Sequence, residues 1–187
     1  YLYLQPRLRQ VDFYEIQTFL RQYGNSHFGE SLRKQWLYQL AKTGDWTTFL
    51  QFYTPQQSTD LQCYYAYARF VSGQQNHADL LKAKNLWLVG KSQPKACDSV
   101  FEYLYQSNLI DDAFVLERIG LAMKKGRLSL ASALAKHLEP DERVWVTLWQ
   151  TMHKKPAQTL ADFAEPDLPV VREIVLHGIK RLAKKTI

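Results

Sequence analysis

The stretch Leu86-Trp87-Leu88-Val89-Gly90-Lys91-Ser92-Gln93-Pro94-Lys95-Ala96-Cys97-Asp98 decides the fold class of this chain. Its apolar beginning completes one expected helix, and Gly90 ends that helix. Pro94 cannot continue a helix, and Asp98 is a suitable residue to start the next one. The stretch therefore predicts two helices joined by a short turn. It also carries one of the two cysteines of the chain.

The same punctuation recurs along the chain: apolar residues at helical spacing, then a glycine, then a polar start. Leu32, Trp36 and Leu40 precede Gly44, for example. Such spacing is typical of helices that bury one face, and no stretch alternates long enough to predict a sheet. Further helix stops are expected at Gly73 and Gly126. The expected helix caps are Asp12, Asp45, one of Ser58, Thr59 and Asp60, then Asp98 and the pair Asp111 and Asp112.

We therefore predict an all-α fold: an irregular α-superhelix, or solenoid, of about ten short antiparallel helices. The helix around residues 61–70 carries apolar side chains on two sides. Helices of this kind are normally covered on both sides, which favours stacked layers. No tetratricopeptide consensus is present. We expect residues 1–187 to form one helical superhelical domain segment.

Composition and charge exclude few functions. The 187 residues are 46% hydrophobic and carry a formal net charge of +6. A basic surface favours anionic partners such as nucleic acid, anionic lipid or peptidoglycan, but it does not choose among them. No apolar run approaches the roughly 20 residues that span a bilayer. Because residues 1–4 hold neither an initiator Met nor a signal-peptide pattern, we expect a mature or trimmed chain.

The two cysteines, Cys63 and Cys97, are 34 residues apart. Two antiparallel helices can bring such positions together, and a disulfide between them would contribute roughly 3.8 kcal/mol in the chain-entropy model. The alternative is two buried free thiols, since cysteine is often simply a small core residue. The spacing alone leaves both possibilities open.

Three blocks of the sequence resemble one known family. They are Gln62-Cys63 with the residues up to Ala68, the stretch from Leu86 to Asp98, and Leu116-Glu117-Arg118-Ile119 with the residues up to Gly126. From about residue 30 to residue 126 the chain looks like the long helical domain of a soluble lytic murein transglycosylase. The resemblance is diffuse on either side of this region. It favours a disulfide between Cys63 and Cys97, and hence an oxidising compartment.

The resemblance implies a periplasmic enzyme whose helices close into a ring that carries a lysozyme-like catalytic domain. Such enzymes cleave the bond between N-acetylmuramic acid and N-acetylglucosamine without adding water. The muramyl 6-hydroxyl attacks instead, which leaves a 1,6-anhydro end. One glutamate performs both proton transfers, and no metal or organic cofactor takes part. The implied partners are peptidoglycan and the enzyme's own catalytic domain, with no nucleic acid and no membrane span.

The family's catalytic glutamate lies in a Glu-Ser pair that is followed by a Gly-Leu-Met-Gln block. The one Glu-Ser pair of this chain is Glu30-Ser31, and no Gly-Leu-Met-Gln block follows it. Glu30 also belongs to the helical part of the match, where an acid at a helix start complements the helix dipole. We therefore expect no catalytic residue in this segment and a lysozyme-like domain outside it.

Other catalytic, metal and cofactor sites are not predicted either. Adjacent Asp111 and Asp112 suit a helix cap better than a pair of glycosidase carboxylates. The five histidines lack metal-ligand spacing, and no P-loop or dinucleotide motif is present. These histidines are His27, His77, His137, His153 and His177.

The basic residues supply the one candidate site. Lys124, Lys125 and Arg127 gather around Gly126, where they are expected either to complement a helix dipole or to contact anionic glycan. Similar clusters occur at Lys91 and Lys95, and at Lys180, Arg181, Lys184 and Lys185. The five tryptophans have mostly the spacing of core residues. We expect a non-catalytic scaffold segment of a periplasmic lytic transglycosylase. The alternatives are a stand-alone helical scaffold that binds proteins and a helical-repeat binder of nucleic acid, which cysteine oxidation opposes.

Overall fold

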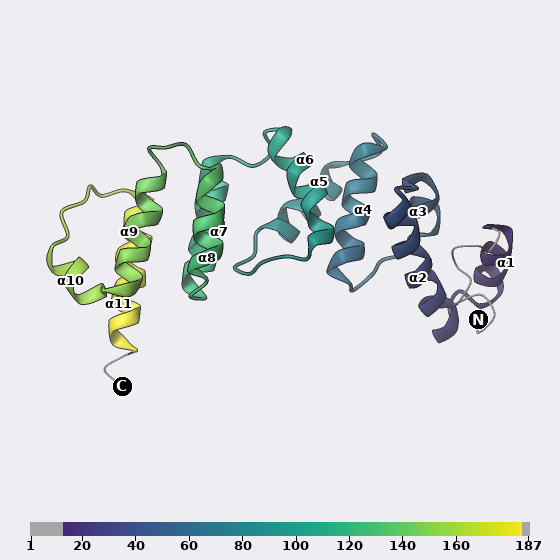
Figure 1. The fold of residues 1–187 in the computed structure, drawn as a ribbon, viewed down its shortest axis with the longest axis horizontal. Coiled ribbons are helices and arrows are strands. Elements are labelled where there is room, and N and C mark those ends of the chain that lie inside the picture. The colour runs from purple at the N-terminus through teal and green to yellow at the C-terminus, as the bar shows by residue number, and fades with distance from the viewer. Residues whose placement is uncertain (1–12, 185–187) are drawn as a thin grey trace. The chain divides into compact units, whose positions relative to one another are not determined.

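The computed structural model describes residues 13–184, and every regular element in that range is helical. The predicted all-α class is confirmed (Figure 1). The expected cap Asp12 and the basic residue Lys185 lie outside the described residues. The α-helices are α1 (Phe13–Tyr23), α2 (His27–Thr43), α3 (Trp46–Phe52), α4 (Thr59–Val71), α5 (His77–Trp87), α6 (Asp98–Gln106), α7 (Asp112–Lys124), α8 (Leu128–Leu134), α9 (Arg143–Lys154), α10 (Pro156–Ala161) and α11 (Pro169–Ala183), and the 3₁₀ turns are η2 (Lys95–Cys97) and η3 (Ala135–His137).

The chain divides into two compact units. The first contains the residues up to Lys84 together with Pro94–Tyr103, and the second contains Asn85–Gln93 together with the residues from Leu104 onward. The stretch from Leu86 to Asp98, which resembles the transglycosylase family, thus contributes to both units. Gln93 belongs to the second unit and Pro94 to the first. The expectation of one domain segment over residues 1–187 stays a prediction.

The core of the first unit lies among α1, α2, α3 and α4. Leu37, Phe49 and Leu61 are fully buried there. The ring of Trp46 packs against Tyr64 and Tyr67 of α4. On its other side α4 contacts η2, so the helix is covered twice, as its sequence pattern predicts.

The second unit packs α7 against α8 and α9 against α11, and these pairs lie side by side in Figure 1. Ile119, Met152 and Ile174 are fully buried between them. Two glycines permit the close packing. A Cβ at Gly120 would lie 2.9 Å from the Trp149 ring, and a Cβ at Gly178 would overlap Met152.

Most predicted helix ends are confirmed. Gly44, Gly73 and Gly126 have φ angles of 74°, 64° and 68°, the left-handed conformation that favours glycine. The carboxylates of Asp45 and Asp111 accept hydrogen bonds from the backbone N–H groups three residues later, at 3.1 and 2.8 Å. These bonds satisfy donors that a helix start leaves free.

Three expected caps differ in detail. Ser58 occupies the N-cap position of α4, but its hydroxyl bonds to the hydroxyl of Tyr38 at 2.9 Å and does not cap. Asp98 is the first residue of α6 itself, because the turn η2 precedes it. Asp112 accepts a hydrogen bond from the backbone N–H of Glu139 at 3.1 Å, so this carboxylate ties the segment after η3 to the start of α7.

Candidate functional site

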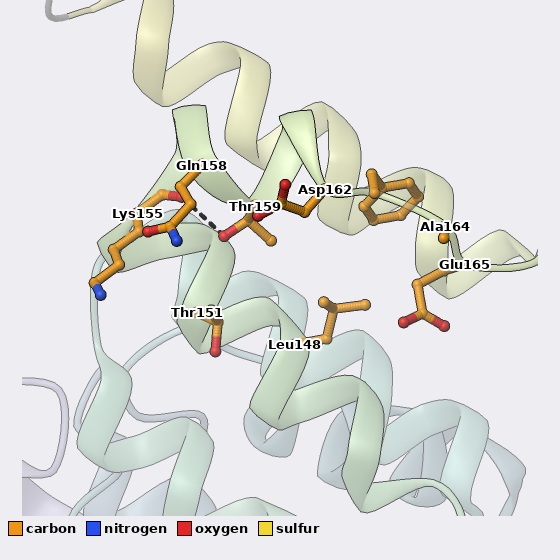
Figure 2. A pocket seen from close by; sticks show the side chains of 9 residues that line it. Leu148, Thr151, Lys155, Gln158, Thr159, Asp162, Ala164 and Glu165 are labelled. Carbon is orange, nitrogen blue, oxygen red and sulfur yellow. Dashed lines mark hydrogen bonds between the residues drawn. The ribbon is translucent and has the colours of Figure 1, made fainter.

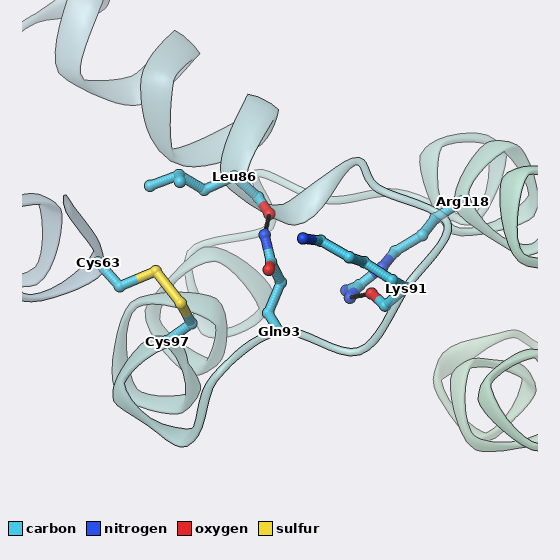
Figure 3. Close-up of a disulfide and its surroundings, with 6 residues drawn as sticks. All are labelled: Cys63, Leu86, Lys91, Gln93, Cys97 and Arg118. Carbon is cyan, nitrogen blue, oxygen red and sulfur yellow. Dashed lines mark hydrogen bonds between the residues drawn. A yellow bond between two sulfur atoms is a disulfide. The ribbon is translucent and has the colours of Figure 1, made fainter. Parts of the chain in front are cut away.

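The turn after α5 is held by one buried arginine of α7. Arg118 is only 4% exposed, and its guanidinium lies 4.6 Å from the centroid of the Trp87 ring. Its Nε donates to the carbonyl oxygen of Val89 at 3.3 Å. Its Nη2 donates to the carbonyl oxygen of Lys91 at 3.5 Å (Figure 3). Burial lowers the pKa of Arg118 below its ordinary value, yet an arginine stays charged in proteins. The cation thereby satisfies carbonyl groups that the turn leaves without helical partners.

Two more residues of the turn have structural roles. The side-chain amide of Gln93 donates to the backbone carbonyl of Leu86, which lies in the last turn of α5, at 2.5 Å. Gly90 is buried, and a Cβ there would overlap the backbone carbonyl of Leu121 on α7. The turn is therefore tightly packed, and the carbonyls of Leu86, Val89 and Lys91 have side-chain donors. We infer from this packing that its role is structural.

The structure contains the disulfide between Cys63 of α4 and Cys97 of η2, with the two Cα atoms 4.9 Å apart (Figure 3). Both cysteines are fully buried. The Cα separation lies within the ordinary range for disulfides. The bridge belongs entirely to the first unit, where it fastens η2 to α4.

Glu30 lies in the first turn of α2 and is exposed. The helix is capped by Ser26, whose hydroxyl accepts a hydrogen bond from the backbone N–H of Gly29 at 3.1 Å. The position is the one in which an acid complements the helix dipole, as the sequence predicts.

The basic residues of the candidate site lie at the end of α7, and all three are exposed. Lys124 forms an ion pair with Glu173 of α11, with Nζ and Oε2 2.9 Å apart. Lys125 and Arg127 make no ion pair within residues 13–184. The cluster is thus accessible to an anion, while one of its members also links two helices. Its contact with glycan stays a prediction.

A pair of histidines was missed by the sequence analysis, which found no ligand spacing among them. His153 of α9 and His177 of α11 are 24 residues apart, and their Nδ1 and Nε2 atoms approach to 3.0 Å. The rings stack with their centroids 5.1 Å apart, and Trp149 packs edge-on against His177. No sequence signal would have found them, because the contact depends on the pairing of α9 with α11.

Burial is the main cause of the perturbed titration of both histidines. Burial, followed by the charges of His153, Arg181 and Lys124, lowers the pKa of His177 to about 4. Burial also lowers the pKa of His153, with further contributions from Arg181 and Lys154. A neutral pair shares one hydrogen bond, in which one ring donates and the other accepts. No cluster of three or more His, Cys, Asp or Glu side chains suited to a metal occurs in residues 13–184.

A shallow pocket of about 280 Å³ lies beside α9 and α10 (Figure 2). Leu148 and Thr151 of α9 form one wall, and Gln158 and Thr159 of α10 form another. Lys155 and the segment 162–165 complete it. The hydroxyl of Thr159 donates to the backbone carbonyl of Lys155 at 2.8 Å. Its lining combines polar side chains with the apolar side chains of Leu148 and Phe163, and nothing in the sequence predicts it.

The tryptophans serve mainly as packing residues, as expected. Trp87 and Trp149 are 1% and 2% exposed, and Trp36 is also buried. Trp46 is partly buried against its aromatic neighbours. The rings of Trp36, Trp87 and Trp149 are therefore covered by other residues of the protein.

Comparisons of the sequence and of the structure with known proteins both find lytic transglycosylases. The chain is 38% identical over 128 residues to the soluble lytic murein transglycosylase of Escherichia coli K12, a match that covers 67% of this chain. The corresponding protein of Salmonella typhimurium is 36% identical over 132 residues, or 70% of this chain. This chain is related to the soluble lytic murein transglycosylases. It covers about a fifth (20%) of the length of these curated relatives, and no family model matches it.

Parts of two solved lytic transglycosylases have the same fold as this chain. An inactive mutant of the lytic transglycosylase Slt from Pseudomonas aeruginosa superposes with a TM-score of 0.83 at 33% identity, over 96% of this chain and 29% of that one. The 70-kDa soluble lytic transglycosylase of E. coli gives a TM-score of 0.79 at 28% identity, over 97% of this chain and 30% of that one. The likeness to these transglycosylases confirms the expected fold class, an irregular α-superhelix.

No helix among residues 13–184 is both long enough and apolar enough to cross a lipid bilayer.

Proposed function

We propose that this chain is a non-catalytic helical scaffold segment of a periplasmic lytic transglycosylase, which cleaves the glycan strands of peptidoglycan with formation of 1,6-anhydro ends. The observation that carries the proposal is the match to the soluble lytic murein transglycosylases, in sequence over 67% of the chain and in fold over 96% of it. The whole enzyme's substrate, peptidoglycan, is taken from the name of these relatives.

The environment of Glu30 supports a scaffold role. A general acid that must stay protonated near neutral pH is usually buried in apolar surroundings. Glu30 is instead exposed in the first turn of a capped helix. The residues that carry the family resemblance are likewise engaged in packing. Arg118 holds the turn after α5, and Cys63 and Cys97 hold η2 on α4.

The buried disulfide supports a periplasmic location. Disulfides persist in secreted and periplasmic proteins and are rare in the cytosol. Both cysteines are fully buried, so a reductant reaches the bond only when the first unit opens. The partners that we propose for the segment are peptidoglycan and the catalytic domain of the same enzyme.

Digestion of purified sacculi tests the proposal. The chain of 187 residues, incubated with sacculi and analysed by mass spectrometry of the soluble products, is expected to release no 1,6-anhydro-muropeptides. Release of such products above the level of a heat-denatured sample would contradict the non-catalytic role. Sequencing of the gene beyond the codon for Ile187 tests the rest. A lysozyme-like domain with Glu-Ser and Gly-Leu-Met-Gln blocks is expected, and a stop codon would favour a stand-alone scaffold.

A further inference from the structure

The His153–His177 pair lies where the ends of α7 and α9 meet the middle of α11. Its nitrogens approach to 3.0 Å, and His177 is only 7% exposed. A Cβ at Gly126, just after α7, would lie 3.8 Å from Cε1 of His153, so the exposed end of α7 is close to this ring. The packed side of the pair is formed by Trp149.

Three cations lie near this pair. Lys124, Lys154 and Arg181 are close enough to the two rings to disfavour their protonation. Lys124 also forms an exposed ion pair with Glu173. Lys154 and Arg181 form no ion pair within residues 13–184, and Nε of Arg181 is buried without a hydrogen-bond partner. The other charged side chains at these helix ends are Lys125, Arg127, Lys155, Asp162 and Lys180.

The arrangement leaves uncompensated positive charge beside a titratable pair. A buried donor that lacks a partner costs free energy, and an anion would relieve that cost. An anion would also stabilise a proton on the histidines, since an opposite charge within a few ångströms favours the charged form.

We propose that the His153–His177 pair and the cations beside it bind a carboxylate of a peptidoglycan peptide stem, and that binding and protonation of the pair reinforce each other. The inference rests on the proposed function for the choice of ligand. The carboxylate accepts hydrogen bonds from Arg181 and Lys154. A proton from solvent goes to the His pair, so that each ring then has an N–H donor besides the hydrogen bond that the two rings share. Each gain is reciprocal, as linkage requires.

The expected consequence is stronger binding in acid. If the carboxylate raises the pKa of the pair by one unit, the affinity rises by up to about tenfold once the pH lies below both values. Because the pKa of His177 starts at about 4, the gain in affinity between pH 7 and pH 5 is about twofold. A surface attraction without the histidines would change little over this range, because peptide carboxylates are already ionised there.

NMR titration of the histidine Hε1 signals in the chain of 187 residues tests the inference. The probe is a soluble disaccharide-peptide from murein, used at constant ionic strength with free stem carboxylates or with the same carboxylates amidated. The free-carboxylate probe is expected to raise the pKa of His153 and His177 and to bind about twofold more tightly at pH 5 than at pH 7. The amidated probe is expected to do neither.

Variants separate this site from general charge. Lys154→Gln and Arg181→Gln are expected to remove the pKa shift. Lys136→Gln, an exposed lysine of the same unit, changes the net charge equally and is expected to keep the shift. His153→Gln, checked for an unchanged amide spectrum, is expected to remove the pH dependence of binding.

Absence of a shift with the free-carboxylate probe, or an equal shift with the amidated one, would overturn the inference. So would tighter binding of a single-stranded oligonucleotide, which would indicate a phosphate site. If the probe causes no pKa shift but the chain still binds sacculi, the inference about the histidine pair is wrong and the proposed function stands. A carboxylate-linked shift in a protein whose gene lacks a catalytic domain would instead remove the proposed function alone.

Discussion

The Arg118 guanidinium lies 4.6 Å from the centroid of the Trp87 ring while it donates to the carbonyl of Val89. One cation thus joins α7 to the end of α5 and satisfies the turn that follows. A buried charge is stable only when its donors are used, and the carbonyls of the turn supply the acceptors. The arginine of the third family block and the turn of the second block therefore form one structural feature.

Replacing Arg118 by methionine is expected to lower the free energy of unfolding by about 2–4 kcal/mol, because charged hydrogen bonds and the contact with Trp87 are lost together. Arg118→Lys keeps the charge but loses the planar fork, so it should lose at least half as much. Urea unfolding followed by circular dichroism measures both. Arg127→Met, at an exposed position, is the control, with a change within about 0.5 kcal/mol. An equal effect of the two methionine variants would contradict the role given to Arg118.

Gly90 offers a second test of the same turn. A Cβ at this position would overlap the carbonyl of Leu121, so Gly90→Ala forces α7 and the turn apart. We expect a loss of about 2 kcal/mol or more in unfolding free energy, as for other overpacked sites. Gly73→Ala is the matched control. It has open space but a φ of 64°, which costs about 1 kcal/mol. If the Gly90 variant were no less stable than the Gly73 variant, the close packing would be wrong.

Removing the disulfide is expected to lower the stability of the first unit. The Cys63→Ala, Cys97→Ala double variant should lose roughly 3.8 kcal/mol in the chain-entropy model, less the cost of any strain released. Denaturant unfolding with and without dithiothreitol measures the difference. The natural protein should become less stable on reduction, whereas the double variant should not respond. Two titratable thiols in unreduced, denatured natural protein would contradict the bridge.

The helices were predictable because their signals are local. Gly44 and Asp45 mark a stop and a start that need no distant partner, and both positions are confirmed. Ser58 looked like a cap from its neighbours alone, but Tyr38, 20 residues away, takes its hydroxyl. His153 and His177 are joined across 24 residues by the packing of two helices. The sequence therefore predicts elements and their ends, whereas contacts between elements depend on a packing that no single stretch encodes.

The stability of the second unit is expected to fall in acid. The pKa of His177 is lowered in the folded protein to about 4, below its ordinary value of about 6.5 in an unfolded chain. The unfolded state therefore binds more protons between these values, so stability is fully present above about pH 6.5 and is lost as the pH falls toward 4. Between pH 7 and pH 4 the free energy of unfolding is expected to fall by about 2–3 kcal/mol.

Unfolding curves at pH 7, 6, 5 and 4 measure this loss. His177→Gln should flatten the pH dependence, although it also lowers the stability at pH 7. His27→Gln, at an exposed position, is the control and should keep the slope of the natural protein. If the dependence of unfolding free energy on pH persisted in the His177 variant and disappeared in the His27 variant, the assignment to His177 would be wrong.

The basic cluster at the end of α7 leads to a prediction about sacculus binding. Lys124, Lys125 and Arg127 are exposed, so their attraction for peptidoglycan carboxylates is long-ranged and screened by salt. Charge reversal of all three is expected to weaken co-sedimentation with sacculi severalfold at low salt and little at high salt. A triple variant at the exposed lysines Lys34, Lys82 and Lys136 changes the net charge equally and controls for it. If position rather than total charge matters, the first variant loses more binding than the second. Equal losses would mean that the cluster is an ordinary part of a basic surface.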